Sequence, residues 1–170
     1  MKVNNFAEDL SCSSMASDED FWNEVYKKAF PDMACHIKYD EKSQSQLLGI
    51  DRIIHLKSGR TIYIDEKKRR SNYDDIALEY EHEDKNGRTW PGWIEKQLCI
   101  DYLAYAFMKK QQVLLYDWQM LRKAWISNKV EWFQKFTNIC AHNNNYITKS
   151  LPIPFKDLHK AVSVARIINI

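Results

Sequence analysis

Two apolar segments joined by a short turn decide the fold: residues 47–56 read LLGIDRIIHL and residues 60–68 read RTIYIDEKK. Between them stands Lys57-Ser58-Gly59, a turn that ends in glycine. Apolar, isoleucine-rich segments on both sides of such a turn predict a β-hairpin. Each strand carries an acid at the end far from the turn, Asp51 on the first and Asp65 on the second.

The length of the turn decides which side chains meet across this hairpin. If the loop is odd and centred on Ser58, Asp51 lies directly opposite Asp65, with Cβ atoms about 5 Å apart. If the loop has two residues, Asp51 faces Glu66 instead. Side chains alternate along a strand, so Asp65 and Lys67 share one face. We favour the arrangement with Asp65 and Lys67, because Asp65 directly follows an apolar residue, as strand-borne metal ligands commonly do.

Acids at the end of an apolar strand need a compensating partner, because burying an unpaired carboxylate is strongly unfavourable. Two hard oxygen ligands with several waters suit Mg²⁺, with Mn²⁺ as an alternative. A lysine beside them polarises the attacking water or stabilises negative charge growing on a phosphate. We therefore predict a magnesium centre whose candidate catalytic residues are Asp51, Asp65, Glu66 and Lys67, the three acids also being candidate metal ligands.

Asp51, followed 14 residues later by Asp65-Glu66-Lys67 on the next strand, resembles the motif of the PD-(D/E)XK nuclease superfamily. That superfamily includes restriction endonucleases and Holliday-junction resolvases. Ile50 stands where the motif has a proline. The resemblance covers roughly residues 18–158 and implies an α/β (α+β) fold, with a restriction-endonuclease-like central mixed β-sheet flanked by helices.

The resemblance also implies further site residues. Members of the superfamily often add an acid after the lysine or from the N-terminal helix, which here points to Glu79 as an extra metal ligand in preference to Glu24. Trp90 and Trp93 flank a Pro-Gly turn and either stack on an unpaired base or cover the sheet edge. Cations that contact phosphates fix position and not sequence. The expected nucleic-acid-binding residues are Lys68, Arg69, Arg70 and Arg88, with Lys96 as a further candidate.

Hydrophobic periodicity and turn residues predict the remaining elements. Helices are expected over residues 18–30, over 117–136 with Asp117 as the cap, and from about 155. Extended segments are expected over residues 33–39, 76–82, 98–107, 112–116 and 146–150, with a loop over 83–92 and a break at 152–154. The sum predicts one central, antiparallel-to-mixed sheet flanked by helices.

Composition predicts a single domain over residues 18–170 after a lead-in over residues 1–17. The formal net charge is only +2, so any basic surface must be local. The four cysteines form no CxxC pair, and Cys140 with His142 lacks a second pair of ligands, which favours reduced thiols over a zinc site. No run of about 18 apolar residues and no signal-peptide centre occurs, so we expect a cytoplasmic protein without a membrane partner.

Two classes of function fit this sequence. The first is a magnesium-dependent endonuclease that hydrolyses phosphodiester bonds, with DNA favoured over RNA as the substrate. The second is a catalytically inactive nucleic-acid- or protein-binding module on the same fold. A homodimer is expected by analogy, because cutting two strands takes two active sites. A small stand-alone nuclease would suit a phage or mobile element.

Overall fold

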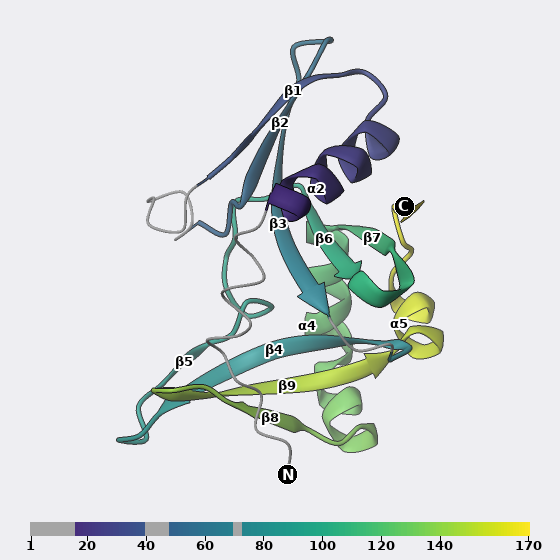
Figure 1. Ribbon diagram of the computed structural model, residues 1–170. Coiled ribbons are helices and arrows are strands. Elements are labelled where there is room, and N and C mark those ends of the chain that lie inside the picture. The colour runs from purple at the N-terminus through teal and green to yellow at the C-terminus, as the bar shows by residue number, and fades with distance from the viewer. Residues whose placement is uncertain (1–15, 40–47, 70–72) are drawn as a thin grey trace.

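A computed structural model describes residues 16–39, 48–69 and 73–170. The fold class expected from the sequence is confirmed: helices pack on a curled mixed β-sheet (Figure 1). The expectation of one sheet is wrong, because four strands form a second, separate sheet. Of the predicted lead-in, residues 1–15 lie outside the described residues. No helix in the described ranges is long and apolar enough to cross a membrane.

The first sheet has six strands in the order β1-β2-β3-β6-β7-β10. Only the central β3–β6 pair is parallel; every other neighbouring pair is antiparallel. A mixed sheet follows, with β3 at its centre. The strands are β1 (Met33–Lys38), β2 (Arg52–Leu56), β3 (Thr61–Arg69), β6 (Tyr102–Phe107), β7 (Gln112–Asp117) and β10 (Arg166–Asn169).

The β2–β3 hairpin has a loop of odd length, which is the first of the two arrangements considered from the sequence. Arg52 pairs with Ile64, and the Leu56 N–H donates to the Arg60 carbonyl at 2.9 Å, which leaves residues 57–59 as the loop. Gly59 closes the loop with φ of +86°, a conformation that glycine adopts without strain. Continuing this register places Asp51 opposite Asp65.

Helix α2 (Ala16–Ala29) covers one face of the first sheet, as its apolar spacing predicted. Trp22, Val25 and Tyr26 are completely buried there, against isoleucines of β2 and β3. Even-numbered residues of β3 therefore point toward α2. The odd-numbered residues, which include Asp65 and Lys67, point to the opposite face.

The opposite face of the first sheet packs into a larger core with helix α4 (Trp118–Lys135) and the second sheet. The predicted cap is confirmed: the Asp117 carboxylate accepts from the Met120 N–H at 3.0 Å. Trp118 and Trp125 are buried in this core, and helix α5 (Phe155–Ala161) closes it where a helix was expected. A 3-10 turn, η1 (Met108–Lys110), links β6 to β7.

The second sheet is antiparallel, in the order β5-β4-β9-β8. The predicted loop over residues 83–92 is instead a hairpin, and the predicted break at 152–154 is strand. Pro152 fits because β8 pairs with β9 only as far as Ser150, so the following residues form an edge where a proline lacks no ladder bond. The strands are β4 (Asp75–Asp84), β5 (Thr89–Pro91), β8 (Ile139–His142) and β9 (Tyr146–Pro154).

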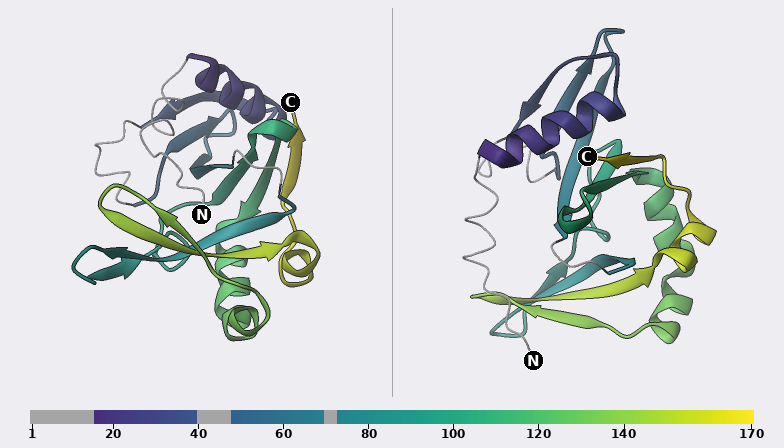
Figure 2. Two further views of the ribbon diagram at one scale, coloured as in Figure 1. Left: turned by 60° about the horizontal axis from the view of Figure 1, so that its bottom comes forward. Right: turned by 45° about the vertical axis from the view of Figure 1, so that its right-hand side comes forward.

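The ends of the second sheet extend beyond α4 and α5, as all three ribbon views agree (Figures 1 and 2). We call this part, residues 81–91 and 140–148, the arm. At its base the register of β4 shifts between Glu79 and Glu81, which is a β-bulge. Gly92 lies against this bulge and donates its N–H to the Tyr80 carbonyl at 2.9 Å.

The contact at Gly92 leaves no room for a side chain. A Cβ there would lie 2.2 Å from the Glu79 carbonyl oxygen. We expect Gly92→Ala to displace the bulge and lower the free energy of unfolding by about 3 kcal/mol, measured by urea titration. Gly87→Ala is the control, since its Cβ meets nothing within 4 Å and its φ of +77° accounts for only about 1 kcal/mol. Equal losses in both variants would contradict a steric origin.

Candidate active site

Asp51 and Asp65 face each other across the hairpin, on the side away from α2. The Asp51 N–H donates to the Ile64 carbonyl at 2.9 Å, which fixes the backbone at the start of β2. Its carboxylate accepts from the Glu66 N–H at 2.8 Å, which fixes the side chain. Asp65 is 2% exposed. The hairpin thus holds two acids together, one half-buried and one buried.

Lys67 completes the group on the same face of β3. Its Nζ lies 2.5 Å from Asp65 Oδ1, and 29% of its side chain remains exposed. Burial alone would lower the pKa of Lys67, but the charges of Asp65, Asp51 and Glu79 raise it above its ordinary value. Lys67 therefore stays protonated at neutral pH.

Asp65 is electrostatically unfavourable as a carboxylate. Burial raises its pKa to about 8; Lys67 opposes this shift and the charge of Asp51 adds to it. Asp65 Oδ2 is buried, and no hydrogen-bond partner for it lies within the described residues. A buried oxygen without a donor is a place where a bound cation would be stabilised.

Glu79 approaches the same group from the second sheet. It is half-buried on β4, beside the bulge. Burial raises its pKa, while the charges of Lys67 and Lys96 lower it. Glu79 thus lies within electrostatic reach of Lys67, and its expected role as an extra metal ligand stays a prediction.

Glu66 does not join these acids. Its side chain lies on the α2 face, where its Oε1 accepts from Arg52 Nε at 2.6 Å and from the Tyr26 hydroxyl at 2.9 Å. Only the backbone N–H of Glu66 contacts the group on the other face of the hairpin, because it donates to the Asp51 carboxylate. We call this face, which is turned away from α2, the front. Neighbouring residues of a strand point to opposite faces, and the pairing of β2 with β3 puts Asp65 on the face of Asp51, which leaves Glu66 on the other face.

Arg52 was missed by sequence reasoning and is the centre of a polar cluster behind the two acids. It is completely buried and bonds Glu19 twice, at 2.6 and 3.1 Å, in addition to Glu66. Its Nη1 also donates to His36 Nδ1 at 2.8 Å. Burial and then the charge of Arg52 lower the pKa of His36, so its ring is neutral. An arginine on the otherwise apolar face of β2 was the available signal.

The residues predicted to contact phosphate differ in exposure. Arg69 is engaged by Asp75 at 2.6 Å and by the Tyr105 hydroxyl at 3.2 Å. Lys68, Arg88 and Lys96 are exposed. Arg70 lies outside the described residues.

The two tryptophans also differ. Trp93 is 5% exposed and packs in the core beside Trp118, so it cannot stack on a base. Trp90 is half-buried on the arm, so part of its ring is accessible to a base.

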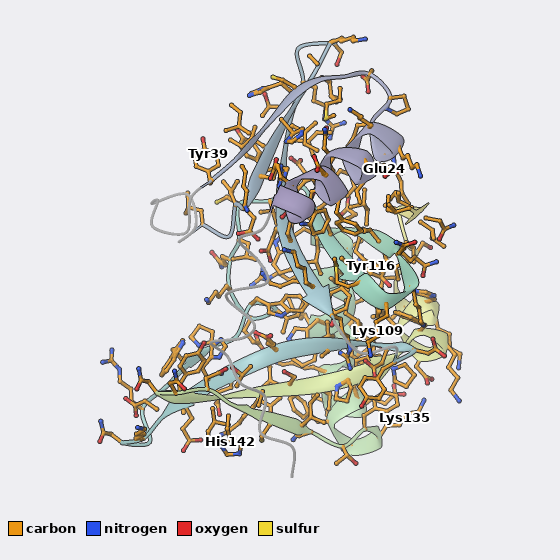
Figure 3. All side chains as sticks on the ribbon, viewed as in Figure 1. Glu24, Tyr39, Lys109, Tyr116, Lys135 and His142 are labelled. Carbon is orange, nitrogen blue, oxygen red and sulfur yellow. The ribbon has the colours of Figure 1, made fainter. Side chains whose placement is uncertain are left out.

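Other candidate ligands lie apart from this centre. Glu24 is on the exposed side of α2, paired with Lys28 at 2.9 Å, while His142 lies at the end of β8 (Figure 3). Cys140 and His142 are both exposed. Among the described residues, no three or more His, Cys, Asp or Glu side chains are arranged to hold a metal ion. The candidate site is therefore limited to the front of the hairpin, where Asp51, Asp65 and Lys67 lie together.

No family model, no curated protein and no solved structure matches this chain.

The raised pKa of Asp65 predicts a pH-dependent stability. Between pH 4 and pH 8 the folded state holds a proton on Asp65 that the unfolded chain, with a pKa near 3.8, has lost. Stability therefore falls as pH rises through this window, by up to about 1.4 kcal/mol per pH unit. Asp65→Asn should reduce this slope, leaving the part that comes from the buried Glu66 and Glu79, whose pKa values burial also raises, and should raise the melting temperature at pH 8, measured in EDTA. Asp74→Asn, at a side chain 84% exposed, should leave the slope unchanged; an unchanged slope in Asp65→Asn would refute the assignment.

The cluster behind the acids predicts a second effect on stability. Arg52→Met leaves the buried carboxylate of Glu66 without its cation, so the free energy of unfolding should fall by about 3–5 kcal/mol in urea titrations. Changing Arg52 and Glu66 together to Met should restore part of this loss, because an apolar pair replaces a buried ion pair at little cost. A double variant as unstable as the single one would contradict this explanation.

Proposed function

We propose that the chain is a magnesium-dependent nuclease that hydrolyses DNA phosphodiester bonds at a centre of Asp51, Asp65 and Lys67. The observation that carries the proposal is their geometry: two opposed carboxyl groups, a protonated lysine 2.5 Å from the buried one, and a buried Asp65 oxygen for which no hydrogen-bond partner lies within the described residues. The proposal includes membership of the PD-(D/E)XK superfamily, whose motif these residues resemble.

The residues present fit a magnesium ion. Mg²⁺ keeps several waters and is commonly bound through one or two carboxylates together with substrate phosphate oxygens. Asp51 and Asp65 supply such a pair, which does not require a third protein ligand. When bound, the cation would supply positive charge that stabilises the reacting phosphate and favours loss of a proton from the attacking water. Mn²⁺ has similar ligand preferences.

Lys67 acts as a cation in this proposal and not as a base. The acids around it raise its pKa, so its ammonium group keeps its proton. The Lys67 side chain is 29% exposed, and the proposal requires that its ammonium meet a phosphate oxygen of the substrate. Its role is to stabilise the charge that grows on the phosphate oxygens during hydrolysis.

Glu79 positions this lysine. Its carboxylate acts on Lys67 from the side of the second sheet, opposite to the hairpin that carries Asp65. Lys67 is then held between acids on two sheets. The bulge of β4, fixed by Gly92, determines where that second acid lies.

Cleavage of labelled single-stranded, duplex and branched DNA with Mg²⁺, Mn²⁺ or EDTA tests the proposal. We expect metal-dependent cutting that falls about 100-fold or more in Asp65→Asn and in Lys67→Ala, because each change removes charge needed in the transition state. Binding of the same DNA in EDTA should be reduced far less than cutting.

Lys110→Ala is the matched control. Lys110 is also an ion-paired lysine, 2.6 Å from Asp74, and its side chain is 30% exposed. Cutting by this variant should equal that of the unmodified protein. DNA binding without any metal-dependent cutting would overturn the nuclease proposal and favour the binding module.

A further inference from the structure

Three aromatic rings gather on the arm, each from a different strand. His82 of β4 stacks on Trp90 of β5, with ring centroids 5.5 Å apart and planes 30° from parallel. Tyr146 of β9 meets His82 edge-on at 5.4 Å and Trp90 at 5.6 Å. All three are half-buried, and none belongs to either apolar core of the described residues.

This aromatic cluster lies on the same face of the second sheet as Glu79. Glu79 pairs with Ser150, and His82 pairs with Thr148 and with Trp90. Ser150, Thr148 and Tyr146 are alternate residues of β9 and so point to one face. About three strand residues, or about 10 Å, separate Glu79 from His82 along β4. The cluster therefore lies beside the proposed reactive centre.

The rings are held in place before any ligand binds. His82 Nδ1 lies 3.1 Å from the Thr148 hydroxyl, which also accepts from Asn143 Nδ2 at 3.0 Å. Thr148 is itself 7% exposed. A ring fixed by a buried partner loses little conformational freedom when another ring stacks on it.

Positive charge borders the aromatic cluster. Burial raises the pKa of Glu79 and lowers that of His82, and the charge of the exposed Lys96 acts on both. Lys96 therefore lies within electrostatic reach of both Glu79 and His82, and exposed Arg88 lies in the turn between β4 and β5.

The acids of the arm are already engaged. Glu81 and Glu83 bond Lys149 at 2.7 and 2.6 Å, and the Asp84 carboxylate accepts backbone N–H groups of its turn. Cations beside stacked rings are the arrangement that binds single-stranded nucleic acid.

We propose that the aromatic cluster of His82, Trp90 and Tyr146 stacks on unpaired bases of DNA, so that the substrate is a strand unpaired next to the cleaved phosphate. The inference rests on the proposed function for the nature of the ligand. Lys96 contacts the backbone between the cleaved phosphate and the stacked bases. A continuous duplex lacks free base faces and binds without the cluster.

Binding is measured in EDTA, where no hydrolysis occurs, by fluorescence anisotropy of a labelled thymidine oligomer and of a duplex of equal length. Stacking on an aromatic ring contributes enough that Trp90→Ala should weaken binding of the oligomer at least ten-fold. Trp90→Phe should retain most of the affinity, and duplex binding should not change.

Phe133→Ala is the matched control, because it removes an aromatic ring that is 37% exposed and lies on α4, away from the cluster. The ring centroids of Phe133 and Tyr80 are 4.9 Å apart, on the other face of β4. It should leave oligomer binding unchanged. A Trp90→Ala variant with a native circular dichroism spectrum and unaltered oligomer affinity would overturn the inference. So would equal losses for oligomer and duplex.

Photocrosslinking of the unmodified protein to an oligomer that contains 5-iodouracil needs no variant and covers the case in which Trp90→Ala fails to fold. The crosslinked peptides should contain Trp90 or Tyr146, and crosslinks confined to other residues would overturn the inference. Oligomer binding through Trp90 without metal-dependent cutting would reject the nuclease and keep this inference. Metal-dependent cutting that is unchanged in Trp90→Ala, with no crosslink to the cluster, would keep the nuclease proposal and reject this inference.

Discussion

The register of the β2–β3 hairpin is the constraint on which the candidate site depends. A three-residue loop closed by Gly59 sets Asp51 opposite Asp65, and because side chains alternate along β3, Glu66 then lies on the other face. With a two-residue loop, Asp51 would meet Glu66, and the buried Arg52 would lose one of its two carboxylate partners. Because one face of β3 packs on α2 and the other faces the second sheet, a slip of one residue would exchange the environments of both acids. Loop length therefore decides the chemistry of this centre as much as the acids do.

The two faces of the hairpin have complementary electrostatic roles. On the side away from α2, burial and the charge of Asp51 disfavour a charged Asp65, and Lys67 offsets only part of this effect. On the back, Arg52 of β2 bonds Glu66 of β3 at 2.6 Å, which ties the two strands together next to the acids that push them apart. The Glu66 backbone N–H joins the two sides, since it donates to Asp51. Two acids can be held close on one side of the sheet because an ion pair joins the same two strands on the other.

The sequence predicted the parts of the fold that have strong local signals. The hairpin, α2 and the capped α4 follow from alternation, helical spacing and Asp117, and all are confirmed. It could not choose the register, because residues 57–59 allow either loop. The strands β8 and β10 were missed since they are short and almost wholly exposed, so no buried alternation marks them. The buried role of Arg52 and the difference between Trp90 and Trp93 arise from tertiary contacts that no local pattern records. The nuclease assignment remains a proposal.

The burial of Asp65 has a consequence for how this protein can change over generations. A carboxylate that is 2% exposed beside a second acid weakens the fold at neutral pH, so a neutral residue of similar size would make the chain sturdier. Random substitution, filtered by stability alone, would remove such an acid. If the proposed function holds, a chain that keeps this acid is less stable than its neutral variant and gains a ligand for the cation. Copies of this gene that had lost the need for that ligand should therefore be recognisable by a neutral residue at position 65, in an otherwise intact hairpin.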